Sequence, residues 1–176
     1  AGGERVITSH IYDNTTASYN SMMAEFSNPA EISWGAYFGF AEFFMTDGIL
    51  LGALPLQDRL VFYKNSSISV ATNNTADETS NDPFILNQDI IKNTGAISMN
   101  TIVALESAHL FFSGENFFMF DGINCRDFGG GVIKYILNNI NKKYVNRSFS
   151  AHIEEEKLYL SFVAWGESEW PSMCIA

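Results

Sequence analysis

The chain has 176 residues, enough for one domain with a substantial core, and its 10 basic and 20 acidic side chains give a formal charge of −10 at pH 7. This balance excludes a broad basic surface that wraps DNA, but it would suit a channel through which DNA passes without adsorbing to the wall. Aromatic residues make up 14% of the chain, a density that favours sheets and broad packed interfaces.

The two cysteines, Cys125 and Cys174, fit neither a disulfide-dense secreted scaffold nor a zinc site, which needs four close ligands. Free thiols are favoured, and a Cys125–Cys174 disulfide stays the open alternative. The longest aromatic run, residues 34–45, is shorter than the ~20 apolar residues of a membrane helix, so no membrane span is expected. The first residues contain neither an initiator Met nor an apolar signal segment, and we expect a piece of a longer protein.

An internal repeat is the most informative feature of the sequence. Leu60, Leu110 and Leu158 lie at intervals of 50 and 48 residues, each inside a short apolar segment bounded by polar residues. Further apolar runs flank these segments across short polar turns, which is the pattern of β-hairpins. Each unit is therefore predicted to be a meander of at least three antiparallel strands.

A period of about fifty residues with three or four antiparallel strands is typical of a β-propeller blade. We therefore predict an all-β, mainly antiparallel fold of propeller-like blades. The chain would form a single domain or a fragment of a larger propeller. Its blade-like units are predicted at residues 5–45, 46–94, 95–145 and 146–176.

The first unit matches the repeat least well. Strands are expected at residues 6–7 and 32–34 of this unit. The aromatic run at residues 34–45 follows neither the strand period nor the helix period. Core packing between blades is favoured for this run, and an anchor surface for a partner subunit is the alternative.

Two segments interrupt the strands. Residues 72–83 are rich in Thr, Asn, Ser, Asp and Glu and are predicted to form a solvated loop. Residues 132–143 are predicted to form an amphipathic helix that lies against the sheets or a neighbouring subunit. Its apolar stripe consists of Ile133, Ile136, Leu137 and Ile140.

Two groups of residues have side chains or backbone suited to ligands. Residues 129–131 are three glycines before the helix, and with Lys134 they could face an anion, but phosphate-loop patterns are missing and a flexible turn is favoured. The histidines are His10, His109 and His152. They include no pair at helical metal-ligand spacing, so ordinary packing or surface placement is favoured.

Residues 154–156, three glutamates, fall at the expected tip of a hairpin, where solvated carboxylates are poorly suited to acid–base chemistry. Neither cysteine has the setting of a known nucleophile, and no Gly-x-Ser-x-Gly elbow occurs. We therefore predict no catalytic, cofactor-binding or metal-binding residue, no cofactor and no enzymatic activity.

Several segments occur in a characteristic order: residues 28–34 (NPAEISW), 56–68 (LQDRLVFYKNSSI), 95–98, 101–103 and 111–122 (FFSGENFFMFDG). In these segments the chain resembles the structural proteins of short-tailed bacteriophage tails, of the nozzle or packaged-DNA-stabilisation type, whose body is a β-propeller. The resemblance covers residues 28–144.

The resemblance implies a virion tail protein that assembles as a homo-oligomeric ring below the portal and forms part of the path for DNA ejection. It implies partners among other tail or portal subunits, and no catalytic residue to carry over. Because 176 residues hold only three to four units, a closed propeller would need more chain or several subunits.

Two alternatives from other classes stay open. The main one is a carbohydrate-binding propeller, a lectin-like module in which Trp34, Trp165 or Trp170 would stack on sugar rings, although these residues do not recur at the repeat period. The second is a secreted propeller hydrolase.

Overall fold

The computed structural model describes residues 7–13, 18–26, 39–74, 84–145, 150–154, 157–167 and 170–175. These residues confirm the prediction of a mainly antiparallel β fold. The predicted strand at 32–34, the opening segment 28–34, most of the predicted loop at 72–83, and Glu155 and Glu156 lie outside the described residues.

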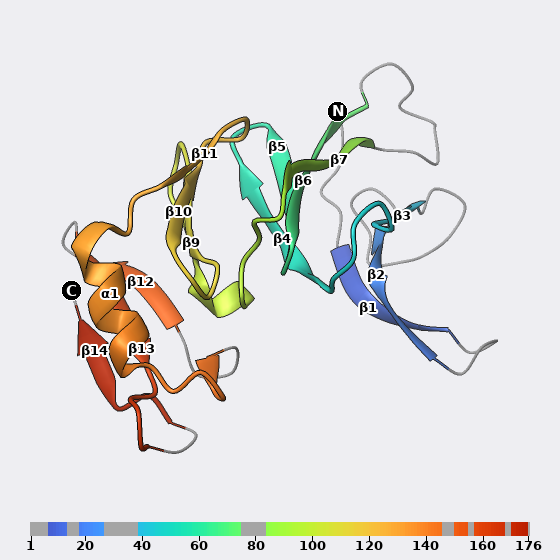
Figure 1. Ribbon diagram of the computed structural model, residues 1–176. Coiled ribbons are helices and arrows are strands. Elements are labelled where there is room, and N and C mark those ends of the chain that lie inside the picture. The colour runs from blue at the N-terminus through green and yellow to red at the C-terminus, as the bar shows by residue number, and fades with distance from the viewer. Residues whose placement is uncertain are drawn as a thin grey trace.

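The described strands form four antiparallel sheets, which follow one another across the molecule in chain order (Figure 1). The first sheet contains β1 (Ile7–Asp13), β2 (Ser18–Phe26) and β3 (Gly39–Glu42). The second contains β4 (Leu50–Leu56), β5 (Arg59–Lys64), β6 (Ser67–Asn73) and β7 (Phe84–Lys92).

The third sheet contains β8 (Ile102–Ala104), β9 (His109–Phe112), β10 (Phe117–Phe120) and β11 (Cys125–Asp127). A short 3-10 helix, η1 (Met99–Thr101), leads into it, and helix α1 (Gly130–Asn139) follows it. The fourth sheet contains β12 (Ser150–Glu154), β13 (Lys157–Phe162) and β14 (Met173–Ile175).

The predicted hairpins are confirmed, because within each sheet every strand pairs with the next strand in the sequence. Two examples are Val103 opposite Leu110 and Ile153 opposite Leu158. The sheets also meet through their first strands: β1 lies against β4, β4 against β8, and β8 against β12. The fold is thus a series of meanders joined along one row of strands.

Three apolar clusters fill the spaces between consecutive sheets. Strand β5 contributes to two of them, because alternate side chains of a strand point to opposite faces. Val61 and Tyr63 pack toward the third sheet, whereas Phe62 packs toward the first. Phe111 and Phe112 of β9 divide in the same way between the two sides of the third sheet.

Helix α1 confirms the predicted apolar stripe. Ile136 and Ile140 are buried between the third and fourth sheets, and Ile133 and Leu137 pack beside them. The predicted end at residue 143 is wrong, because α1 ends at Asn139 and Ile140 has extended backbone with a ψ of 137°. Ile140 forms an isolated bridge with Ala164, and this pairing takes the chain out of the helix.

The predicted loop at 72–83 is wrong at its start. Thr72 and Asn73 belong to β6 and pair with Ile85 and Phe84 of β7. Their polar side chains suit a loop, but the pairing with a neighbouring strand prevails over composition. Among the described residues, no helix combines the length and the apolar character needed to cross a membrane.

Candidate functional site

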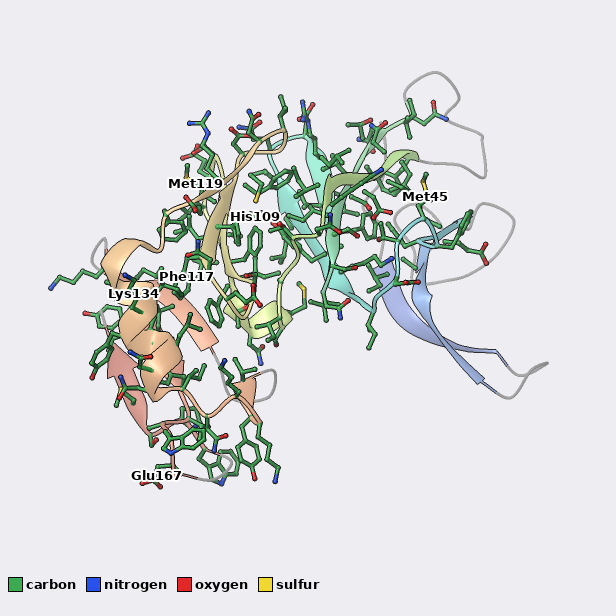
Figure 2. All side chains as sticks on the ribbon, in the orientation of Figure 1. Met45, His109, Phe117, Met119, Lys134 and Glu167 are labelled. Atoms are coloured by element: carbon green, nitrogen blue, oxygen red, sulfur yellow. The ribbon has the colours of Figure 1, made fainter. Side chains whose placement is uncertain are left out.

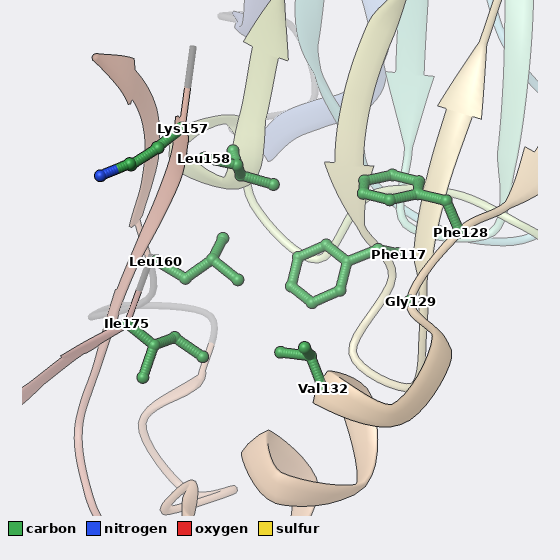
Figure 3. A pocket seen from close by; sticks show the side chains of 8 residues that line it. All are labelled: Phe117, Phe128, Gly129, Val132, Lys157, Leu158, Leu160 and Ile175. Carbon is green, nitrogen blue, oxygen red and sulfur yellow. The ribbon is translucent and has the colours of Figure 1, made fainter. Parts of the chain in front are cut away.

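Described residues of the C-terminal half form an apolar pocket of about 250 Å³. It lies where the start of α1 and strand β10 meet the fourth sheet (Figure 3). Its lining residues are Phe117, Phe128, Gly129, Val132, Lys157, Leu158, Leu160 and Ile175.

The local sequence explains how this pocket forms. Leu158 and Leu160 are two residues apart on β13 and therefore share the face that looks toward α1. Gly129 has no room for a side chain, since a Cβ there would come within 2.2 Å of Asn116 Oδ1. The chain can therefore turn tightly into α1 and bring Val132 over the pocket.

The pocket is suited to an apolar group. Figure 3 shows the side chains of Phe117, Val132 and Leu160 converging on the space, while the amine of Lys157 points away from it. A well-formed apolar cavity of about 150 Å³ accommodates a benzene ring. This larger pocket could therefore take an aromatic ring together with a short aliphatic chain, with a positive charge at the rim.

The glycines, Lys134 and the histidines, for which no ligand role is predicted, lie in different parts of the described structure. Gly129 lines the pocket, whereas Lys134 is exposed on α1 and does not line it. His10 and His152 belong to β1 and β12, in the first and fourth sheets. Glu154 ends β12.

The two tryptophans of the C-terminal part are exposed. Trp165 is 77% exposed and Trp170 78% exposed, both in the connection between β13 and β14. Trp34 lies outside the described residues. Cys125 and Cys174 are free thiols, and burial raises the pKa of Cys125 to about 11.

His109 is fully buried and links the second and third sheets. Its Nε2 lies 3.0 Å from the carbonyl oxygen of Pro55, and its Nδ1 lies 3.0 Å from the hydroxyl of Tyr63. A carbonyl only accepts, so Nε2 carries the proton and Nδ1 accepts from the Tyr63 hydroxyl. Burial lowers the pKa of His109, although the Pro55 carbonyl opposes this, and burial also raises the pKa of Tyr63.

Lys64 is the charged residue that sequence reasoning missed. It ends β5, is only 1% exposed, and donates from Nζ to the carbonyl of Phe43 at 2.9 Å and to Oγ1 of Thr46 at 3.1 Å. The carbonyl of Thr46 is a further acceptor. Burial lowers the pKa of Lys64, and the charges of Asp89 and Asp47 oppose this shift.

Asp89 lies at an irregular point of the pairing between β6 and β7 and has a positive φ of 50°. Its Oδ1 accepts from the Ser67 hydroxyl at 2.6 Å, and its backbone N–H donates to Ser69 Oγ at 2.9 Å. The other carboxylate oxygen, Oδ2, is buried without a hydrogen bond to any described residue. Because Ser67 also contacts Thr46, Asp89 and Lys64 belong to one buried polar network.

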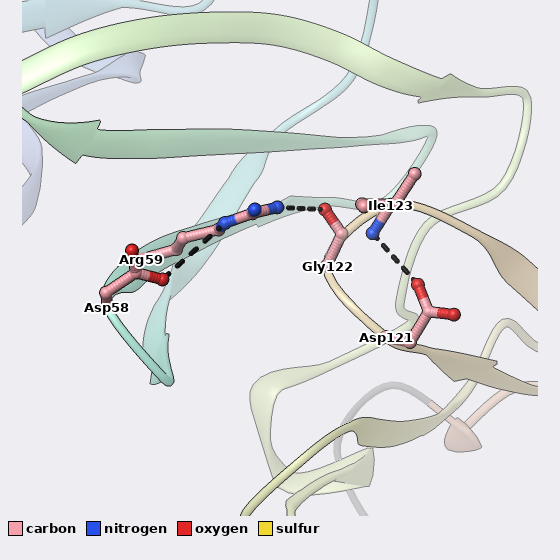
Figure 4. A network of polar contacts seen from close by, with 5 residues as sticks. All are labelled: Asp58, Arg59, Asp121, Gly122 and Ile123. Atoms are coloured by element: carbon pink, nitrogen blue, oxygen red, sulfur yellow. Dashed lines mark hydrogen bonds and ion pairs between the residues drawn. The ribbon is translucent and has the colours of Figure 1, made fainter.

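A second polar link between the second and third sheets is partly buried (Figure 4). Nη1 of Arg59 donates to the carbonyl of Gly122 at 3.1 Å. Asp121 holds the Gly122 turn, since its Oδ1 accepts from the backbone N–H groups of Ile123 and Asn124. These two donors hold the pKa of Asp121 below its ordinary value.

The described residues contain no group of three or more His, Cys, Asp or Glu side chains placed to hold a metal ion. No protein-family model matches the chain, and no curated protein matches it.

Proposed function

We propose that the chain is a virion structural protein of a bacteriophage tail, in which the four sheets act as propeller-like blades. In this role it assembles with further copies and with other tail or portal subunits to form part of the path for DNA ejection. It binds no cofactor and catalyses no reaction.

One observation carries this proposal: each apolar cluster lies between two consecutive sheets, and the first strands of those sheets form one row. Blades around a propeller axis pack in this manner, with their first strands innermost. The order of the segments that resemble nozzle-type tail proteins, between residues 28 and 144, supports the same assignment.

The side chains that link neighbouring sheets also suit a structural role. Tyr63, His109 and Arg59 each form a hydrogen bond between the second and third sheets. Groups that are bound to one another in this way fix the angle between blades. The formal charge of −10 would keep DNA from adsorbing to a conduit wall.

The test is the assembly state of the protein, measured by mass and by negative-stain imaging, alone and with purified portal or tail subunits. A ring or a specific tail complex supports the proposal. A monomer that binds neither portal nor tail subunits contradicts the proposal.

A carbohydrate-binding module is the second candidate, because Trp165 and Trp170 expose most of their indole surfaces. Exposed aromatic faces are suited to stacking on sugar rings. A glycan screen with the wild-type protein and a Trp165→Ala/Trp170→Ala variant tests it. Binding that the variant loses favours this candidate over the tail protein.

A further inference from the structure

One stretch of the chain, residues 128–153, contains no acidic residue and four of the 10 basic ones, namely Lys134, Lys142, Lys143 and Arg147. The other residues carry 6 basic and 20 acidic side chains, a formal charge of −14. The three lysines are exposed, and Arg147 lies outside the described residues. A local basic surface in an otherwise acidic protein indicates a site that contacts an anion.

The connection between β13 and β14 lies against this basic stretch. The backbone N–H of Trp165 donates to the carbonyl of Asn139 at 2.6 Å, and the side-chain amide of Asn141 donates to the carbonyl of Glu167 at 2.9 Å. These hydrogen bonds fix the connection beside the turn that follows α1. Trp165 is 77% exposed and Trp170 78% exposed, so this connection brings two solvent-exposed indole rings to the basic stretch.

The exposed cations and rings of these two segments are called the basic aromatic surface below. Figure 2 shows Lys134 and Glu167 at the end of the molecule away from Met45. The ring of Tyr135, 51% exposed on α1, belongs to the same surface. The members are Lys134, Tyr135, Lys142, Lys143, Trp165 and Trp170.

The positive charge of the surface is modest. Glu167 and Glu169 come between the two tryptophans and reduce it, but residues 128–153 and 163–172 together still have a formal charge of +2. The acids at the borders of the basic stretch belong to β11 and β12. Attraction of a polyanion by so few charges is weak and depends on salt, so a ligand must also use the exposed rings.

The structure of α1 favours a nucleic acid over a membrane surface. A helix that binds lipid presents a broad apolar face, whereas α1 buries its apolar stripe between the third and fourth sheets. Apart from glycines, its exposed residues are Val132, Lys134, Tyr135 and Asn138. Lysines that contact phosphates, next to aromatic rings on which bases stack, are typical of proteins that bind single-stranded nucleic acid.

We propose that the basic aromatic surface binds a nucleic-acid strand with unpaired bases. The lysines contact its phosphates, and Trp165 and Trp170 stack on base faces that a continuous duplex keeps covered. This inference rests on the proposed passage of DNA along the tail, and it names the surface of the chain that touches the DNA.

The first test measures binding of a labelled oligothymidine of about 16 nucleotides by fluorescence anisotropy at about 50 to 200 mM salt. Three or four cations predict a slope of about −2 to −3 for the logarithm of the association constant against that of the salt concentration. Lys142→Gln/Lys143→Gln should make this slope shallower by about 1.4. Lys92→Gln, which removes an exposed lysine of β7, is the matched control and should keep the slope. A wild-type protein that does not bind at the lowest salt, or a double variant with the wild-type slope, overturns the proposal.

The second test removes the rings. Trp165→Ala/Trp170→Ala should weaken binding at least about tenfold, because each stacked base contributes roughly 5- to 150-fold. Phe44→Ala, which removes a 67% exposed ring at the other end of the molecule, is the control. The duplex of the same oligothymidine with oligoadenosine should bind more weakly and should not respond to the tryptophan variant. Equal binding of the tryptophan variant and wild type to the single strand contradicts the proposed stacking.

Parallel probes separate the ligand classes. These are vesicles of phosphatidylcholine with about one-third phosphatidylserine, and a glycan screen. Binding to vesicles or glycans without binding to the oligothymidine overturns the inference. A ring or tail complex that binds no oligothymidine overturns the nucleic-acid contact alone. Oligothymidine binding by a monomer that binds neither portal nor tail subunits contradicts the tail role alone.

Discussion

The Tyr63 hydroxyl lies 3.0 Å from Nδ1 of His109, and this buried hydrogen bond joins the second and third sheets. The two rings also pack with centroids 5.9 Å apart. Both side chains are fully buried, so solvent water cannot take the place of either partner in this hydrogen bond.

Tyr63→Phe should lower the free energy of unfolding by about 1–3 kcal/mol, because Nδ1 of His109 then stays buried without a donor. Urea unfolding measures the change. Tyr135→Phe is the control, since Tyr135 is 51% exposed and should change stability little. Equal stability of Tyr63→Phe and wild type would show that the hydrogen bond contributes nothing net.

The stability of the fold should depend on pH through His109. Burial lowers its pKa in the folded state relative to the value of about 6.5 in an unfolded chain. The unfolded state therefore binds the proton more readily, so this contribution is complete above about pH 6.5 and is lost as the pH falls through the folded-state pKa.

The measurement is urea unfolding of wild type and His109→Gln from about pH 7.5 to 5. The variant should lose less stability than wild type as the pH falls through this window. Parallel pH profiles for the two proteins would exclude His109 as the group responsible.

Phe112 is fully buried between the third sheet, α1 and the fourth sheet, and its ring packs on that of Phe117 with centroids 4.8 Å apart. Phe112→Ala should therefore destabilise the fold by about 3–5 kcal/mol. Phe44→Ala removes an exposed ring of the same size and should change stability by less than about 0.5 kcal/mol. Thermal or urea unfolding compares the two, and a loss under about 1 kcal/mol at Phe112 would contradict a core role.

Two glycines should respond in opposite directions to replacement by Ala. A Cβ on Gly95 would come within 2.1 Å of the carbonyl oxygen of Lys64 and within 2.7 Å of further backbone atoms, which cannot move aside cheaply. A Cβ on Gly131, in α1, meets nothing within 4 Å. Gly95→Ala should cost about 1–3 kcal/mol or more, and Gly131→Ala should stabilise by up to about 1 kcal/mol. A neutral result at Gly95 would mean that the backbone around Lys64 adapts.

Local patterns made the strands predictable. The segments around Leu60, Leu110 and Leu158 combine apolar runs with polar turns, and their pairing with the next strand needs no information from distant residues. The ends of elements were less predictable. Ile140 continues the helical stripe but leaves the helix because it pairs with Ala164, a residue from another part of the chain.

Most residues of the candidate site could not be predicted from the sequence. Lining residues of the pocket come from positions between 117 and 175, and only the packing of α1 between two sheets brings them together. The run of three glycines predicts a flexible turn at Gly129, and this residue lines the pocket. Lys64 follows four hydrophobic residues in β5, but its acceptors at Phe43 and Thr46 belong to a loop whose position depends on the first two sheets.

The pairing of each strand with its neighbour in sequence has a consequence for how the chain acquires its structure during synthesis. Every ladder in the described part closes over a short stretch of chain, so each meander can form soon after its last strand leaves the ribosome. The clusters between sheets then assemble one after another, each against a meander that has already folded. A chain that folds in this order exposes one unfinished apolar face at a time, and this limits aggregation during synthesis.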